Sequence, residues 1–536
     1  MKFPAFLTLF LGAFVCVAIF TSGDYSLSWD EPTRWNSGNL KVDYYERLIS
    51  EDDKLEVIRM SPHDLYPGLY DIPLAIARRS FPGNDVLLSR IWNVAFGILT
   101  ILMTVLITRF LLRKFCQSLK PEIISIASVF SGVMLLAIPE FYGHIFINPK
   151  DVPFAAMYSL ATFALLRLVG SFPEPRLGDY AFLGITTGLA MAMRPPGVIF
   201  IAYFGAVATL WCFVGEKKDG RLLGARGVLG FSWRGALVAL LALIVLIPWW
   251  PRSHRNPFGA SAQAVGELNN FSNTIPVLYD GQMYDAGTTP SSYVIWMFLV
   301  KMPEWILALF VIGLVLGLLW RTNLVALVRG NRHAVFLVGL TAFVVIFPVV
   351  YVFIKNSAIH NGYRHMLYVL PSACALGSLI WAVGMNRIWK DRRKRILGLV
   401  VTLLCLLYSF SINIRLHPYQ YVYYNYLVGG TAGSLNKYET EYWYTSGKRA
   451  LDEIIDYVGE AGEGSGNIRL FVSGPWQILE PYLPDGYFLS NDASDADFYI
   501  GNTQMRMDTI LEGEEIIRIE RMGLPICIVK KLREMR

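Results

Sequence analysis

The sequence predicts a polytopic α-helical membrane protein with a small α/β domain at its C-terminal end. Three observations support this fold class. Mean hydropathy is +0.41, and charged residues make up only 17% of the 536 residues, whereas a soluble domain usually carries about 25%. Apolar runs of roughly 17 to 25 residues recur along the chain, which is the length that crosses a bilayer as a helix. The last part of the chain changes to short strand-like runs separated by Pro, Gly and Asp.

The apolar runs predict about eleven membrane-spanning helices. The first begins at Phe3 and ends at Thr21. It is long enough to span, and no small-x-small cleavage site precedes Asp24, so we expect a retained helix and not a cleaved signal peptide. The expected spans lie at about 3–21, 88–112, 122–139, 152–170, 179–194, 195–214, 234–250, 303–320, 335–353, 366–386 and 396–412.

Basic residues indicate how these spans are oriented. Lys and Arg in short loops mark the cytoplasmic side. With the N-terminus inside, every basic cluster lies on that side, and an odd number of spans places the chain after 412 outside. We therefore expect an integral multi-pass protein of the cell (inner) membrane, and the net charge of +6 does not indicate nucleic-acid binding. The clusters are Arg113–Lys114, Lys217–Lys218 with Arg221 and Arg226, Arg321 with Arg329 and Arg332, and Arg387–Arg395.

Two domains follow from this topology. Residues 1–412 form the membrane domain, and residues 413–536 form an extracytoplasmic C-terminal domain. The external loops of the membrane domain lie at about 22–87, 140–151, 251–302 and 354–365, with a short surface helix expected at Tyr44–Leu48. The C-terminal domain is expected to contain a helix at Leu451–Val458, a flexible turn at Gly459–Gly466, and strands at Ile468–Val472, Phe498–Ile500, Ile516–Ile519 and Ile526–Val529.

Acidic residues lie where two of the predicted spans meet the membrane surface. Asp30 and Glu31 follow the first span, and Asp151 begins the fourth. A carboxylate at that depth could take a proton from a hydroxyl or hold a cation. Polar residues of this kind also occur simply where a helix leaves the lipid. For the pair taken alone that is the commoner case, because a short acidic pair is a weak motif.

Cations stand at the same face of the predicted bundle. Lys150 precedes Asp151, Arg194 lies at a bend before two prolines, and Arg364-His365 opens the tenth span. External Arg residues run against the usual distribution of charge, and guanidinium matches phosphate in a bidentate fashion. Carboxylates beside an anion site are what glycosyl transfer from a polyprenyl-phosphate sugar requires. No Gly-rich phosphate loop of a soluble nucleotide-sugar enzyme is present.

The chain resembles the membrane glycosyltransferases of the GT-C class, nearest to family 39, which includes protein O-mannosyltransferases and aminoarabinose lipid A transferases. The resemblance covers about residues 1–430. The residues that carry it are Asp30-Glu31, Asn148-Pro149-Lys150-Asp151-Val152-Pro153, Gly188-Leu189-Ala190 with Arg194-Pro195-Pro196-Gly197, Gly362-Tyr363-Arg364-His365 with Leu370-Pro371, and the stretch His417–Asn425 with Gly429-Gly430.

The resemblance implies direct, inverting transfer of a sugar from a polyprenyl-phosphate donor to a hydroxyl or phosphate on a glycan, lipid or protein. By the same resemblance, Asp30 is the general base, Glu31 positions the acceptor or a cation, and Asp151 is a second catalytic acid. Arg364 meets the donor phosphate, together with Lys150, Arg194 and His365. Two departures stand out. Relatives often carry Lys where this chain has Arg194, and the tail after 430 lacks the repeat domain of eukaryotic protein O-mannosyltransferases.

Two other classes of protein stay open. A multi-pass transporter would place ionisable residues inside the spans and show repeated halves, whereas here the charges lie at the mouths. A non-catalytic scaffold could share the fold. No cofactor is implied with certainty. A divalent metal is left open, since His144, His254 and His365 lie on the external side, but their spacing has no metal signature. The six cysteines show neither a metal pattern nor a disulfide framework. Sugar, lipid length, acceptor and oligomeric state cannot be read from the sequence.

Overall fold

The structure is a computed structural model of the chain. It describes residues 3–50, 66–115, 119–215, 224–254, 256, 259, 263–264, 266–267, 274–319, 331–460 and 467–533. Three predicted features lie partly or wholly outside these residues: the turn after Gly459 beyond residue 460, the basic residues Lys217, Lys218 and Arg221, and the basic residues Arg321 and Arg329.

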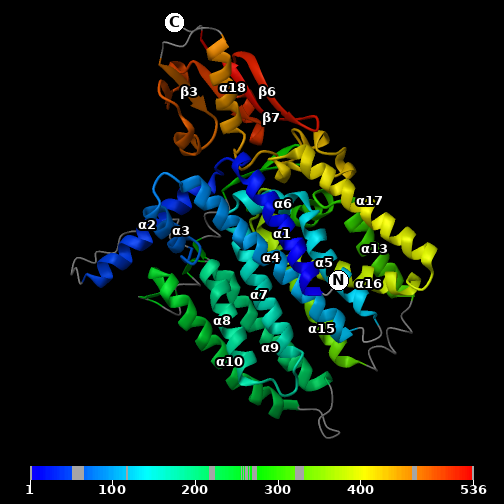
Figure 1. The fold of residues 1–536 in the computed structure, drawn as a ribbon. Coiled ribbons are helices and arrows are strands. Elements are labelled where there is room, and N and C mark those ends of the chain that lie inside the picture. The colour runs from blue at the N-terminus through cyan, green and yellow to red at the C-terminus, as the bar shows by residue number, and fades with distance from the viewer. Residues whose placement is uncertain are drawn as a thin grey trace.

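A bundle of long apolar helices makes up most of the described chain (Figure 1). Each of the eleven predicted spans overlaps one of these helices. They are α1 (Phe3–Thr21), α4 (Asp85–Phe115), α5 (Pro121–Leu136), α7 (Asp151–Val169), α8 (Leu177–Met193), α9 (Ile199–Val214), α10 (Gly224–Leu246), α13 (Glu304–Leu319), α15 (Arg332–Lys355), α16 (Leu370–Ile388) and α17 (Arg392–Leu416). The predicted helical membrane fold is confirmed.

Not every span is a straight helix. By length and composition, eight described helices could each cross a membrane, and two bent pairs raise that number to ten. One pair joins α5 to α6 (Pro139–Ile147) at 73°, and the other joins α12 (Tyr293–Val300) to α13 at 110°. Helix α8, with 17 residues, is apolar but shorter than any of the eight segments that could cross a membrane alone. The bends bring α6 and α12 to the end of the bundle where the predicted external loops lie.

Helices α8 and α10 approach closely because α8 carries glycines on one face. A Cβ at Gly188 would lie 2.6 Å from the Val245 Cβ and 2.7 Å from the Ala242 carbonyl oxygen. Gly184 meets α10 in the same way, one helical turn earlier. Small residues at this spacing let two membrane helices pack backbone to backbone. The close contact fixes the C-terminal end of α8, where Arg194 follows.

The loops at one end of the bundle are joined by hydrogen bonds. The Asn331 side chain donates to the Lys114 carbonyl oxygen at 3.4 Å, and the Arg332 guanidinium donates to the Gly215 carbonyl oxygen at 3.2 Å. The ends of α4 and α9 and the start of α15 therefore lie together. This is the end that carries the described basic residues assigned to the cytoplasm.

The opposite end carries two helices that lie outside the bundle. Helix α2 (Asp30–Ile49) is far longer than the short surface helix expected at Tyr44–Leu48, and α3 (Asp71–Ser80) packs against it. The Asp71 carboxylate accepts from Arg34 at 2.6 Å and from Lys41 at 2.7 Å, and all three side chains are buried. This buried cluster fixes α3 to α2 and sets the start of α2 at Asp30.

A sheet domain covers this end of the bundle (Figure 1). Its strand order is β4-β3-β5-β7-β6, with β4 and β5 parallel to β3 and with β7 antiparallel to both of its neighbours. Helix α18 (Gly447–Glu460) buries Leu451, Ile454 and Val458, which lie at helical spacing on one face. The strands are β3 (Ile468–Val472), β4 (Tyr487–Leu489), β5 (Phe498–Asn502), β6 (Glu514–Arg521) and β7 (Leu524–Lys531), and a separate hairpin pairs β1 (Pro276–Tyr279) with β2 (Gln282–Asp285).

Candidate active site

One cavity of about 620 Å³ lies between the bundle and the sheet domain, and it gathers most of the residues singled out from the sequence. Its volume is within the usual range for small-molecule sites. The predicted residues that line it are Asp30, Lys150, Arg194, Arg364 and His365. They come from the start of α2, the α6–α7 turn, the end of α8 and the 3₁₀ helix Arg364–Val369. Two other predicted residues, Glu31 and Asp151, are not among the lining residues.

Asp30 lies between two cations. Its Oδ1 is 3.0 Å from the Lys150 Nζ, and its Oδ2 is 3.5 Å from the nearest Arg364 nitrogen. Burial acts to raise the pKa of the Asp30 carboxyl, but Lys150 and Arg364 outweigh it, and the pKa lies below its usual value. Asp30 is therefore an ionised carboxylate at neutral pH. Its side chain is 15% exposed.

Asp151 lies behind the cavity lining. Its Oδ1 is 2.8 Å from a terminal nitrogen of Arg194, and its Oδ2 accepts from the Asn148 amide at 2.8 Å. Asn148 also accepts from the backbone N–H groups of Lys150 and Asp151, which fixes the turn that presents Lys150. The expectation that Asp151 is a second catalytic acid stays a prediction. In this structure its carboxylate contacts Arg194 and Asn148, an arrangement that would position Arg194.

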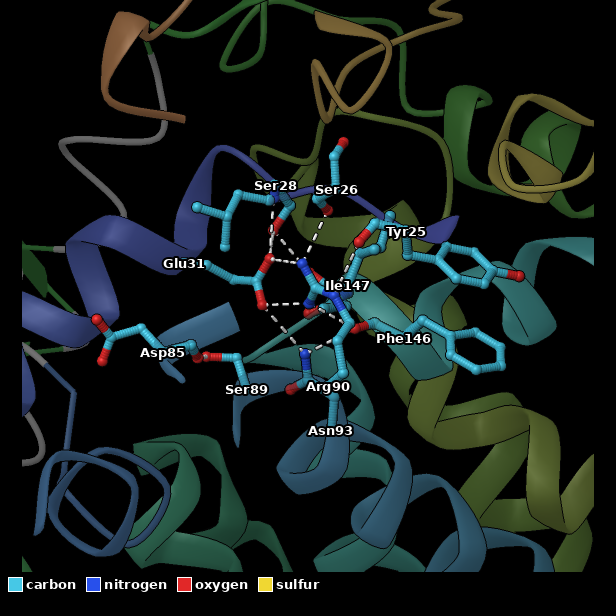
Figure 2. Close-up of polar contacts among 12 residues, drawn as sticks. Tyr25, Ser26, Ser28, Glu31, Asp85, Ser89, Arg90, Asn93, Phe146 and Ile147 are labelled. Atoms are coloured by element: carbon cyan, nitrogen blue, oxygen red, sulfur yellow. Dashed lines mark hydrogen bonds and ion pairs between the residues drawn. The ribbon is translucent and has the colours of Figure 1, made fainter. Parts of the chain in front are cut away.

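Glu31 faces away from the cavity, into a buried cluster (Figure 2). Its Oε2 accepts from Arg90 at 2.9 Å and from the Ser28 backbone N–H at 2.9 Å. Adjacent residues on an α-helix point about 100° apart, so the Asp30 and Glu31 side chains point in different directions. The expected role of Glu31 in holding the acceptor or a cation stays a prediction, and in this structure its carboxylate contacts Arg90 and Ser28. Glu31 anchors the start of α2.

Arg90 is the centre of that cluster, and it was not among the residues singled out from the sequence. Its guanidinium donates to the carbonyl oxygens of Tyr25 at 3.2 Å, Ser26 at 2.8 Å and Phe146 at 2.8 Å. It lies inside a predicted apolar span, where a single Arg has no local pattern to mark it. Its contacts tie the stretch before α2 to the end of α6.

Arg364 is held from three sides. Besides Asp30, it donates to the His360 Nε2 at 3.0 Å, and it lies 4.6 Å from the centre of the Trp443 ring. Burial, His365 and Arg364 lower the pKa of His360 well below its usual value. A neutral His360 can accept the guanidinium hydrogen bond. Neither His360 nor Trp443 was singled out from the sequence as a site residue.

A buried segment without regular secondary structure forms part of the cavity. It runs from Tyr438 to Ser446 and contributes Tyr442, Trp443 and Tyr444 to the lining. Glu439 in this segment accepts from the backbone N–H of Asn361 at 2.7 Å. The segment has neither helical nor strand periodicity, so sequence reasoning missed it. Its run of aromatic residues beside two glutamates was the available signal.

Metal ligands do not gather within the described ranges. There, no group of three or more His, Cys, Asp or Glu side chains has the geometry to hold a metal ion. His144 bonds to Tyr442 and Asn148, and His254 bonds to Tyr44. His365 lines the cavity beside His360, with ring centres 4.6 Å apart.

Comparisons with known proteins give structural likenesses only. No protein-family model matches the chain, and no curated protein matches it. Among solved structures, the chain is similar to ArnT from Cupriavidus metallidurans in the apo state, at a TM-score of 0.49 and 14% identity over 98% of both chains. It is similar to ArnT bound to undecaprenyl phosphate, at a TM-score of 0.47 and 16% identity over 97% of this chain and 98% of that one.

A third similar structure is larger than this chain. The Archaeoglobus fulgidus oligosaccharyltransferase in its apo form overlays with a TM-score of 0.42 at 11% identity, over 81% of this chain and 57% of that one. All three structures overlay with TM-scores below 0.5 and at no more than 16% identity.

Proposed function

We propose that the protein is an integral membrane glycosyltransferase. It moves a sugar from a polyprenyl-phosphate donor to an acceptor on the extracytoplasmic face. The observation that carries the proposal is the contact of Asp30 with both Lys150 and Arg364 in one cavity, with Arg194 in the same lining. A carboxylate that could act as a base thus lies within a cluster of cations that could hold a phosphate.

The donor phosphate fits the cations. Lys150, Arg194 and Arg364 line the cavity, and the described carboxylates paired with them are those of Asp30 and Asp151, so among the described residues one positive charge is in excess. The Arg194 and Arg364 Nε atoms are buried, and neither has a hydrogen-bond partner among the described residues. A phosphate oxygen would supply an acceptor for such a group. Arg364 begins an apolar helical segment long enough to cross a membrane, so a phosphate bound there would lie at the depth of the membrane surface.

Transfer needs one base and one leaving-group site. The Asp30 carboxylate would take the proton of the acceptor hydroxyl, and the hydroxyl oxygen would bond to the anomeric carbon as the bond from that carbon to the phosphate oxygen breaks. The polyprenyl phosphate would leave with the bonding electrons, held by Lys150, Arg194 and Arg364. One displacement of this kind inverts the anomeric centre. When a phosphate engages Lys150 and Arg364, they neutralise Asp30 less, which raises its basicity.

The test uses the purified protein in lipid nanodiscs. The donor source is a lipid extract of a deletion strain of the source organism, in which unused donor should accumulate. Mass spectrometry follows the loss of polyprenyl-phosphate sugar and the gain of polyprenyl phosphate on adding wild-type protein. Asp30→Asn protein is the matched control and should leave the donor intact. No loss of donor with the wild-type protein and a membrane extract as acceptor would refute the proposal.

A further inference from the structure

The cavity has two unlike walls. Among the described residues, its charged lining residues are Asp30, Lys150, Arg194 and Arg364, which belong to the helical bundle and its loops. A second wall comes from residues 442–444 and 473–475 together with Gln504, Met505 and Met507; none of these carries a charge, and this wall meets the first where the Trp443 ring lies against Arg364. We call this second surface the uncharged wall. Its polar groups are amide, hydroxyl and indole groups.

Two buried donors of the uncharged wall lack partners among the described residues. Gln504 is 1% exposed, and its Oε1 accepts from the Thr440 backbone N–H at 3.2 Å, but its Nε2 bonds to no described residue. The Trp443 Nε1 likewise bonds to no described residue, and Trp443 is also 1% exposed. A buried donor left without an acceptor destabilises the folded state. Two of them in one wall point to a ligand that brings oxygen acceptors.

The backbone of this wall is also strained. Tyr444 and Met505 adopt left-handed conformations, with φ of 59° and 53°, which cost an ordinary side chain roughly 1–2 kcal/mol. The Tyr444 ring packs directly on the backbone of Gly474, where a Cβ would lie only 2.0 Å from the ring. Strained residues of this kind collect at ligand sites. The three segments of the uncharged wall are thus held in one fixed arrangement.

An exposed aromatic ring borders the same wall. Trp29 is 44% exposed and meets Tyr444 edge to face, with ring centres 4.8 Å apart. It directly precedes Asp30 in the chain. A sugar ring has an apolar C–H face and an edge of hydroxyl groups, so it suits a wall of aromatic rings with a few neutral hydrogen-bonding groups.

We propose that the uncharged wall binds a sugar ring of a glycan acceptor, so that the group that receives the new sugar is a neutral hydroxyl and not a phosphate. This inference rests on the proposed function and goes further, because it decides between the two acceptor chemistries. A phosphate acceptor would need a cation on its own side of the cavity. Among the described residues, the lining cations are Lys150, Arg194 and Arg364, the same three that the proposed function assigns to the donor phosphate.

The experiment offers two acceptor probes to the wild-type protein in nanodiscs, with the deletion-strain lipid extract as donor. Octyl glycosides of several neutral sugars form one set, and octyl phosphate is the other. Mass spectrometry should find one added sugar on at least one octyl glycoside and none on octyl phosphate. Gln504→Met, which removes the amide at similar length, should raise KM for the modified glycoside by roughly 3- to 10-fold and leave the Kd for undecaprenyl phosphate unchanged.

Matched variants keep the inference falsifiable. Gln282→Met makes the same substitution at an exposed side chain outside the cavity lining and should change nothing. Gly474→Ala displaces Tyr444 and should also raise KM for the glycoside. Sugar added to octyl phosphate alone would overturn the inference and leave the proposed function standing, as would an unchanged KM in both wall variants. If the donor is consumed neither with the two probes nor with a membrane extract, both the inference and the proposed function are overturned.

Discussion

Asp30 and Lys150 meet at 3.0 Å although one begins α2 and the other belongs to the α6–α7 turn. The contact holds the Asp30 carboxylate in the cavity lining. It makes Asp30 the first residue to test. Asp30→Asn keeps the size and hydrogen bonding of the side chain but cannot accept a proton, so the rate of transfer should fall by a factor of ~10² to 10⁴.

The same variant has a second expected outcome. Loss of the negative charge frees Lys150 and Arg364, so the Kd for undecaprenyl phosphate should stay the same or decrease. Thermal denaturation should be close to wild type, because Asp30 is partly exposed. Asp151→Asn is the comparison variant. Because Asp151 pairs with Arg194, this variant should mainly raise the Kd for undecaprenyl phosphate. If Asp30→Asn turns over like wild type while Asp151→Asn is inactive, the base has been misassigned.

Arg364→Lys should weaken the donor site. Lysine keeps the charge, but it cannot bond Asp30 and His360 at once while lying against Trp443. Loss of a charge-assisted hydrogen bond predicts a Kd for undecaprenyl phosphate that is ~10- to 100-fold higher. Arg518→Lys, at an exposed pair with Glu515, is the control and should bind as wild type. A wild-type Kd for Arg364→Lys would remove Arg364 from the phosphate site.

Arg90→Met should destabilise the protein and not merely slow it. The substitution leaves the Glu31 carboxylate buried without its cation, which costs ~3–5 kcal/mol. Thermal denaturation in detergent should show a lower Tm, and the double variant Glu31→Leu with Arg90→Met should recover part of it. Activity lost at a wild-type Tm would instead mean that Glu31 acts on the substrate.

Stability should depend on pH through two buried carboxyls. Burial raises the pKa of Glu439 to about 7 and that of Glu441 to about 7, whereas an unfolded glutamate titrates near ~4.3. Between these values the folded state holds protons that the unfolded state has lost, so stability falls as pH rises toward 7 and levels off above it. Tm should be higher at pH 5.5 than at pH 8, and Glu439→Gln with Glu441→Gln should reduce the difference. An equal pH dependence in the double variant would contradict this assignment.

Orientation can be tested by cysteine labelling. Gly464 and Ser465, natural sites for a probe in the predicted turn, lie outside the described residues, so an exposed position in the sheet domain is the better choice. A cysteine at Ser494 should react with a membrane-impermeant reagent in intact cells, and one at Lys390 should react only after permeabilisation. The opposite result would reverse the proposed topology.

The sequence located elements better than it located their contacts. Apolar length alone located a described helix at each predicted span, although only eight segments, or ten with the bent pairs, could cross a membrane by length and composition. Strand β3 was predicted residue for residue. Helix α10 was expected to start near 234 but starts at Gly224, because its first turns carry charged residues that the apolar pattern excludes. Strand β4 has three residues, too few for a pattern to be seen.

The site was predictable only in part, for a related reason. Asp30, Lys150, Arg194 and Arg364 stood out because a charge at a membrane mouth is unusual. His360, Trp443 and Gln504 have ordinary neighbours in the sequence, and only the fold brings them to the cavity. The different directions of Asp30 and Glu31 could have been anticipated, since successive side chains on a helix that begins at this pair point about 100° apart.

The Arg90 cluster also has a mechanical consequence. One guanidinium ties the stretch before α2 to the end of α6, and the Ser28 hydroxyl donates to the Ile147 carbonyl oxygen beside it at 2.7 Å. Asp30 and the turn that carries Lys150 are therefore coupled through one buried cluster. The same stretch also reaches the other side of the cavity, because the Trp29 backbone N–H donates to the Trp443 carbonyl oxygen at 3.1 Å and the Leu27 N–H donates to the Tyr482 hydroxyl at 3.2 Å, so a rearrangement of either side would be felt at Asp30.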